Sequence, residues 1–175
     1  SDGTQLADQI ENVYKPTAGG GLAWNATNDG FFYTRYPHKG ERPKEDLDFY
    51  QQVYFHKLGT DAKKDTYELG KEFPRIAEIH LQASPDGEHT LATVSNGDGG
   101  DYEHHLRTPQ GTWTRLTNFA DQVKYGRFGR HGDLYMMSRA GAPRGKIIRL
   151  DLKQPELAKA KTLIGESADV IQGLQ

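Results

Sequence analysis

A two-strand pattern recurs three times along this chain and constrains its fold more than any other feature. Each copy has a strand that ends in an apolar or aromatic anchor, a polar turn closed by glycine, and a second strand rich in aromatic or aliphatic residues. The turn glycines are Gly30, Gly87 and Gly132, at intervals of 57 and then 45 residues. Because four-stranded propeller blades repeat about every 40 to 50 residues, the recurrence predicts an array of such blades.

The predicted fold is all-β, a partial β-propeller of about three consecutive four-stranded antiparallel blades. Closed propellers have about four to eight blades, so three blades would leave two open flanks, and we expect a larger parent protein. The longer first interval is explained by the charged segment 38–48, which contains Pro43 and is expected to be an exposed loop. We expect a leader from a preceding blade at 1–19, blades at 20–72, 73–120 and 121–167, and the start of a further blade at 168–175.

Alternating apolar positions and turn signals place four strands in each expected blade. The leader is expected to be a loop and strand from the preceding blade, or a short helix, and the tail 169–174 to begin an inner strand. In the first blade, strands are expected at 21–25, 30–36 and 65–69, with another in the run QQVYFHKLGT; the second has 76–83, 90–94, 104–108 and 113–116; the third has 123–128, 134–139, 146–150 and 161–164.

Composition excludes several classes of partner. The 22 basic and 24 acidic residues are interspersed and give a net charge of −2, so no long-range field would attract nucleic acid or anionic lipid. No apolar run approaches the roughly 18 residues of a membrane span. The chain has no cysteine, which excludes disulfides and thiolate metal sites but does not separate a bacterial cytoplasm from a periplasm.

The search for a nucleophile predicts no catalytic residue. None of the five serines lies in the Gly-x-Ser-x-Gly turn of an α/β-hydrolase, and both Ser84, in a turn, and Ser138, in a strand, are expected to be structural. The acidic residues of segment 38–48 are expected to be solvated, which leaves them without the shifted pKa that catalysis needs.

No metal or other cofactor is expected. The seven histidines are scattered, and the adjacent His104 and His105 would point to opposite faces of a strand. The sequence NGDGGD at 96–101 is similar in composition to a calcium loop but lacks its ligand pattern, so a turn is favoured. In the segment 124–128, cations alternate with aromatics as in single-strand binders; we favour instead Tyr125 and Phe128 in the core and Arg127 at the channel or an edge.

Two further strand motifs identify a family resemblance. The strand DGFFYTRYP at 29–37 and the strand VYFHKLGTD at 53–61, separated by a charged loop and followed by Ser-Pro-Asp-Gly at 84–87, resemble the propeller domain of the prolyl oligopeptidase family of serine peptidases. The resemblance covers most of residues 20–175. It implies a two-domain enzyme in which a seven-bladed propeller covers a separate α/β-hydrolase domain that performs the catalysis.

By this resemblance, the chain would be a non-catalytic segment that admits short peptides to the hydrolase domain and excludes folded proteins. Some members carry an aromatic, a methionine and an arginine that reach the bound peptide; Gly19, Glu78 and Ser95 stand near those places, so strict proline preference is not implied. The alternative is a free-standing interaction module that completes its ring by self-association through open blade edges. The inner strands suggest four residues that would line the tunnel, namely Glu78, His80, Lys124 and Arg127.

Overall fold

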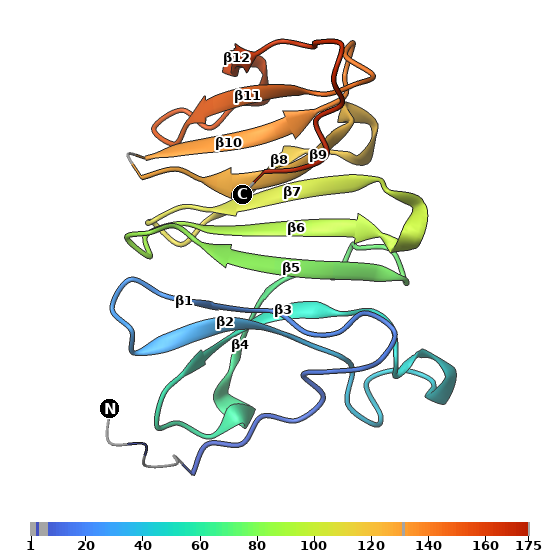
Figure 1. Cartoon of the computed structure of the whole chain (residues 1–175). Coiled ribbons are helices and arrows are strands. Elements are labelled where there is room, and N and C mark those ends of the chain that lie inside the picture. The colour runs from blue at the N-terminus through green and yellow to red at the C-terminus, as the bar shows by residue number, and fades with distance from the viewer. Residues whose placement is uncertain (1–2, 4–6, 131, 175) are drawn as a thin grey trace.

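Three four-stranded antiparallel sheets make up the computed structural model, which describes residues 3, 7–130 and 132–174. They are stacked face to face (Figure 1), and the prediction of three antiparallel four-stranded blades is confirmed. The first sheet contains β1 (Leu22–Trp24), β2 (Gly30–Arg35), β3 (Gln52–Lys57) and β4 (Thr66–Leu69); the second contains β5 (Ala77–Ala83), β6 (Thr90–Asn96), β7 (Tyr102–Arg107) and β8 (Trp113–Thr117); the third contains β9 (Val123–Phe128), β10 (Asp133–Ser138), β11 (Lys146–Asp151) and β12 (Lys161–Ile164).

Every sheet follows the same meander, in which each strand pairs with the next along the chain. β1, β5 and β9 therefore occupy one edge of their sheets, and β4, β8 and β12 the opposite edge. β3, β7 and β10 each carry an irregularity in register, at Val53/Tyr54, His104/His105 and Met137/Ser138. Such bulges increase local twist. Within the described part of the chain, the helical content is confined to short 3-10 turns at Lys44–Asp46, Ala62–Lys64, Gly97–Gly99, Phe119–Asp121 and Leu157–Lys159.

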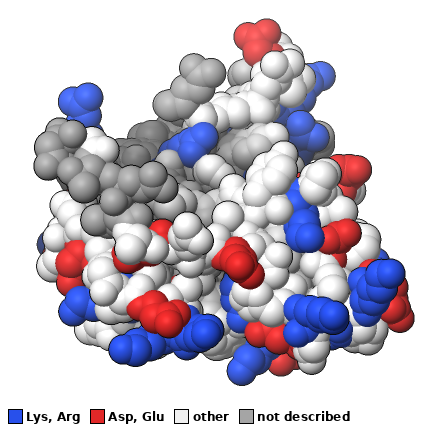
Figure 2. Space-filling view, turned by 90° about the horizontal axis from the view of Figure 1, so that it is seen from below, with Lys and Arg blue, Asp and Glu red and all other residues white. Residues whose placement is uncertain are grey.

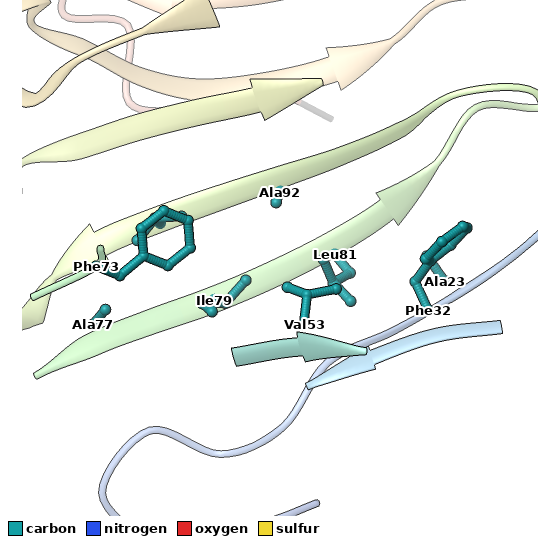
Figure 3. Close-up of a cluster of buried hydrophobic side chains, with 9 residues drawn as sticks. Ala23, Phe32, Val53, Phe73, Ala77, Ile79, Leu81 and Ala92 are labelled. Carbon is teal, nitrogen blue, oxygen red and sulfur yellow. The ribbon is translucent and has the colours of Figure 1, made fainter. Parts of the chain in front are cut away.

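The first and second sheets enclose one apolar core (Figure 3). Alternate residues of β1, β2 and β3 point into it because side chains of a strand change face at each residue. Phe32 and Val53 meet Ile79 and Leu81 of β5, and Phe73 closes one end. Burial of these side chains stabilises the stack by about 25 cal/mol per Å² of apolar surface removed from water.

A second core lies between the second and third sheets. Leu91 and Leu106 contribute from the second sheet, Leu134 and Met136 from the third, and all four are at most 1% exposed. The cluster is completed by Leu116, Val123, Ile148, Leu150 and Leu152. The second sheet is therefore apolar on both faces, as expected for a blade with a neighbour on each side.

In the turn of the first blade, Asn28 takes the left-handed conformation and Gly30 begins β2. A Cβ at residue 30 would lie 2.5 Å from both the His56 carbonyl oxygen and the Phe55 ring.

The expectations for the two ends of the chain were wrong. The tail 169–174 forms no strand; Ile171 donates its N–H to the Arg144 carbonyl at 2.8 Å. Residues 7–19 form neither strand nor helix, only an isolated bridge between Lys15 and Gly19; residues 1–2 and 4–6 of the expected leader lie outside the described residues.

The outward face of the first sheet is rich in exposed apolar groups. Leu22 and Trp24 are 49% and 42% exposed, and Leu22 lies with Phe31 and Tyr14 around an apolar groove of about 410 Å³. Figure 2 views the molecule from this end: charged groups are densest along the lower and right margins, and an uncharged area lies beside the grey atoms. Among the described residues, no helix has the length and apolar character needed to cross a membrane.

Candidate functional site

The four expected tunnel residues lie on the first strands of two neighbouring sheets, at two levels. Glu78 and Lys124 are the second residues of β5 and β9, near the loops at one end of the stack. His80 and Arg127 lie farther along the same strands. Glu78 and Lys124 therefore lie near the loops, whereas His80 and Arg127 lie farther from them along the strands.

Lys124 is engaged by the neighbouring loop. Its ammonium donates to the Gly100 carbonyl oxygen at 2.7 Å and lies 3.5 Å from Asp101, which leaves the side chain only 18% exposed. The loop 96–101 forms a 3-10 turn followed by a left-handed Gly100, as its turn-forming composition predicts. The ammonium of Lys124 thus balances the negative charge of Asp101 in the loop that is similar in composition to a calcium site.

Glu78 lines a different hollow, of about 230 Å³, between the first and second sheets. Arg75 shares this hollow but is already paired, with its Nε donating to Asp46 at 2.7 Å and its guanidinium 3.6 Å from the Phe49 ring centre. Glu78 and Arg75 therefore lie at the loop end of the stack, in a different hollow from His80 and Arg127.

His80 and Arg127 line a common hollow of about 370 Å³ between the second and third sheets. Desolvation of the imidazole, followed by the nearby positive charge of Arg127, lowers the pKa of His80. Neither side chain makes a hydrogen bond or ion pair with a described residue. The hollow is completed by Thr93, Tyr102, Tyr125, Gly126, Gly173 and Leu174.

Two tyrosines of this hollow were not anticipated as site residues. Tyr125 was expected in the core but is 40% exposed, and its ring lies 5.9 Å from that of Tyr102 across the two sheets. Desolvation raises the pKa of Tyr102, so its phenol remains protonated and can donate a hydrogen bond. Each aromatic was visible in the sequence, but their contact depends on how the sheets stack. Phe128 does pack against the second core, as predicted.

A buried polar cluster fastens the N-terminal segment to the first sheet. His56 is fully buried; its Nδ1 lies 2.8 Å from Asp65 and its Nε2 3.4 Å from Asp8. Tyr33 donates to the other oxygen of Asp65 at 2.7 Å, and Asp8 accepts from the Gly59 N–H at 2.6 Å. The contacts join four parts of the chain, which indicates a structural role.

The remaining polar candidates have structural contacts. Ser84 accepts from the His89 N–H and donates to Asp86 within its turn. His104 contacts Thr117 at 2.8 Å and His105 contacts Glu103 at 3.0 Å, on opposite faces of β7 as predicted. Across the described ranges, no group of three or more acidic or histidine side chains is arranged to hold a metal. His131 lies outside them.

The sequence as a whole matches one protein family. A family model described as "Prolyl oligopeptidase, N-terminal beta-propeller domain" matches residues 1–175. The chain belongs to this prolyl oligopeptidase propeller family. The family resemblance seen in its strand motifs is therefore confirmed, and the three sheets are blades of a propeller domain.

Curated relatives of this propeller domain are peptidases. The chain is 25% identical over 173 residues to the prolyl endopeptidase of Elizabethkingia meningoseptica, covering 94% of this chain and 23% of the relative. It is 26% identical over 176 residues to prolyl oligopeptidase A of Amanita bisporigera, covering 90% and 22%. The chain thus spans less than a quarter of these relatives, and it contains no catalytic domain.

Solved structures confirm the propeller architecture. Prolyl oligopeptidase B from Galerina marginata, in its apo form, superimposes with a TM-score of 0.71 at 20% identity, covering 94% of this chain and 22% of that protein. Oligopeptidase B from Leishmania major gives a TM-score of 0.68 at 15% identity, covering 94% and 22%. At these identities the similarity establishes the fold, in which these blades form part of a much longer chain.

Proposed function

We propose that this chain is a non-catalytic propeller segment that controls the access of short peptides to a separate α/β-hydrolase domain of a serine peptidase. The observation that carries the proposal is the whole-length match to the prolyl oligopeptidase propeller domain. The stacked blades support it, because two buried cores make a continuous wall from which the first strands present polar side chains.

A rigid wall of this kind would select by size. A flexible peptide enters a narrow channel as an extended chain, whereas a folded protein would first have to unfold. Exclusion of bulk water from the enclosed space strengthens the electrostatic interactions of the hydrolase site. The propeller would therefore contribute selectivity and shelter, and the hydrolase domain would contribute the nucleophile.

Two experiments on the natural full-length polypeptide test this function. First, a fluorophosphonate probe, which labels activated serines, is expected to label a species several times heavier than 19.6 kDa. Second, the same cleavable sequence is offered as a free peptide and within a folded domain. Rapid cleavage of only the free peptide supports gating, whereas equal rates would contradict it. The 175-residue chain alone is expected to hydrolyse neither substrate.

A second function, a self-assembling interaction module, is favoured by the exposed apolar face of the first sheet. Leu22 and Trp24 are exposed on this face, and exposed apolar patches are typical of surfaces that bind another protein chain. An unlabelled native species of about this chain's own mass would support the module over the peptidase segment.

A further inference from the structure

The hollow between β5 and β9 has the character of an anion site. It contains the guanidinium of Arg127 and the imidazole of His80, together with the phenols of Tyr102 and Tyr125, and no carboxylate is among its described lining residues. The nearest acidic residue on β5, Glu78, lines the separate hollow near Arg75. Besides desolvation, the charge of Glu78 still acts on Tyr102 and helps to raise its pKa, but among the described residues no carboxylate forms an ion pair with Arg127.

Arg127 has no side-chain hydrogen bond or ion pair with a described residue, whereas four of the other nine arginines are paired with a carboxylate. Arg35, Arg75, Arg107 and Arg149 each donate to a carboxylate at 2.7–3.1 Å. An arginine that lines a hollow without such a partner retains its planar set of donors for a ligand. Guanidinium groups bind carboxylates through two parallel hydrogen bonds, which favours a carboxylate over a neutral group.

Gly126 brings Arg127 and His80 together. A Cβ at this residue would lie 2.8 Å from the Leu91 side chain of β6, so glycine permits β9 to approach the second sheet closely. This approach places Arg127 beside His80 and places the ring of Tyr125 5.9 Å from that of Tyr102. Desolvation raises the pKa of Tyr102, so its phenol is protonated and carries an O–H donor.

We infer that this hollow, defined by His80, Tyr102, Tyr125 and Arg127, binds a carboxylate of a peptide that enters the channel. The inference rests on the proposed function for the identity of the ligand as a peptide. Arg127 would pair with the carboxylate, Tyr102 would donate to it, and the two rings would pack against the adjoining peptide chain. Bound negative charge would also stabilise protonated His80, so binding would strengthen as pH falls toward 6.

The test uses the natural full-length polypeptide with its reactive serine blocked by a fluorophosphonate. Fluorescence anisotropy measures the binding of three dye-labelled six-residue peptides: one with a free C-terminal carboxylate, one amidated, and one amidated with glutamate as its last residue. We expect an acidic peptide to bind about tenfold tighter than the neutral amide, as for other charge-assisted hydrogen bonds. Preference for either acidic peptide supports the inference and identifies the carboxylate that the hollow prefers; equal affinity of all three overturns it.

Matched variants locate the effect. Arg127→Gln is expected to abolish the preference, and Arg127→Lys to retain part of it, because lysine keeps the charge but not the paired donors. Arg115→Gln changes an exposed arginine on the outer strand β8 and is expected to keep the full preference. A preference that survives Arg127→Gln would overturn the inference, provided that circular dichroism shows a folded variant.

The outcome is separable from that of the proposed function. Hydrolysis of peptides by the unblocked protein, without any carboxylate preference in binding, would overturn only the carboxylate site. A carboxylate preference that depends on Arg127, in a protein that neither reacts with the probe nor cleaves peptides, would overturn the peptidase assignment and leave the site in place.

Discussion

Trp113 on β8 donates its indole N–H to Glu68 on β4 at 2.8 Å, and this bond joins the outer strands of two neighbouring blades. Arg107 donates to the same carboxylate oxygen at 3.1 Å. Both donors also contact Phe32: the guanidinium lies 4.6 Å from the centre of its ring, and the indole meets it edge-on. One carboxylate thus fixes the second blade on the first at the margin of their shared core.

Replacing this carboxylate is expected to loosen the interface between the first two blades. Glu68→Ala would leave a half-buried indole N–H and an arginine without their acceptor, which costs about 1–3 kcal/mol. Glu68→Gln keeps an acceptor and is expected to cost less. Urea unfolding of the purified chain measures the change, with Glu72→Ala, an exposed glutamate on the loop after β4, as the control. An effect of Glu68→Ala no larger than that of the control would contradict this role.

The turn after β5 depends on glycine for two reasons. Gly87 has φ +72, and a Cβ there would lie 2.6 Å from the Ala26 backbone in the corresponding turn of the first blade. Gly87→Ala is therefore expected to destabilise the chain by at least the roughly 1–2 kcal/mol of a left-handed alanine. Thermal unfolding checks this.

Gly99 provides the matched control for the turn experiment, since a Cβ at Gly99 would meet nothing within 4 Å. Gly99→Ala is expected to leave the melting temperature nearly unchanged. Equal melting temperatures for the two variants would show that the contact between the turns of the first and second blades has no energetic importance.

Local pattern predicted the blades well because each strand is specified by its own alternation and turn residues. The conformations of β3, with the sequence QVYFHK, and of the Ser-Pro-Asp-Gly turn after β5 follow from residues that are close together in the sequence. The close approach of Phe55, on another strand, to Gly30 could not be predicted from the residues around Gly30. Local chemistry therefore sufficed for β-strands and turns, but not for contacts across strands.

The candidate site was harder to predict because it depends on how sheets stack. Alternation placed His80 and Arg127 on inner strands, but it could not show that Lys124 turns to the loop at Gly100. Nor could it bring Tyr102 and Tyr125 together. The distances between blades follow from the packing of side chains such as Leu91 against Gly126, which no single strand encodes.

Acid is expected to destabilise the chain through buried histidine. Burial, and then the charge of His105, lower the pKa of His104 to about 3, against about 6.5 when unfolded. Below pH 6.5 the unfolded chain takes up a proton that folded His104 does not, so its linkage contribution weakens folding by about 1.4 kcal/mol per pH unit until the folded pKa is reached.

His104→Gln separates this contribution from those of other histidines. Glutamine does not titrate and can still hydrogen-bond Thr117, so the variant is expected to lose stability less steeply between pH 6.5 and 5, whatever its stability at pH 7. Urea unfolding at several pH values gives the slope. Identical slopes for the variant and the original chain would exclude His104 as a source of the acid sensitivity.

Exposed apolar groups on the outward face of the first sheet are expected to drive self-association of the isolated chain. Leu22 and Trp24 are nearly half exposed beside an apolar groove, and association would remove that surface from water. Leu22→Glu would place a charge in the contact and is expected to shift the chain toward the monomer.

Sedimentation equilibrium over a range of concentrations measures the change, and Gln110→Glu, in an exposed turn of the second blade, controls for added charge. A monomer at every concentration in the original chain would show that this face does not associate with copies of itself, whereas equal association in both variants would place the contact elsewhere.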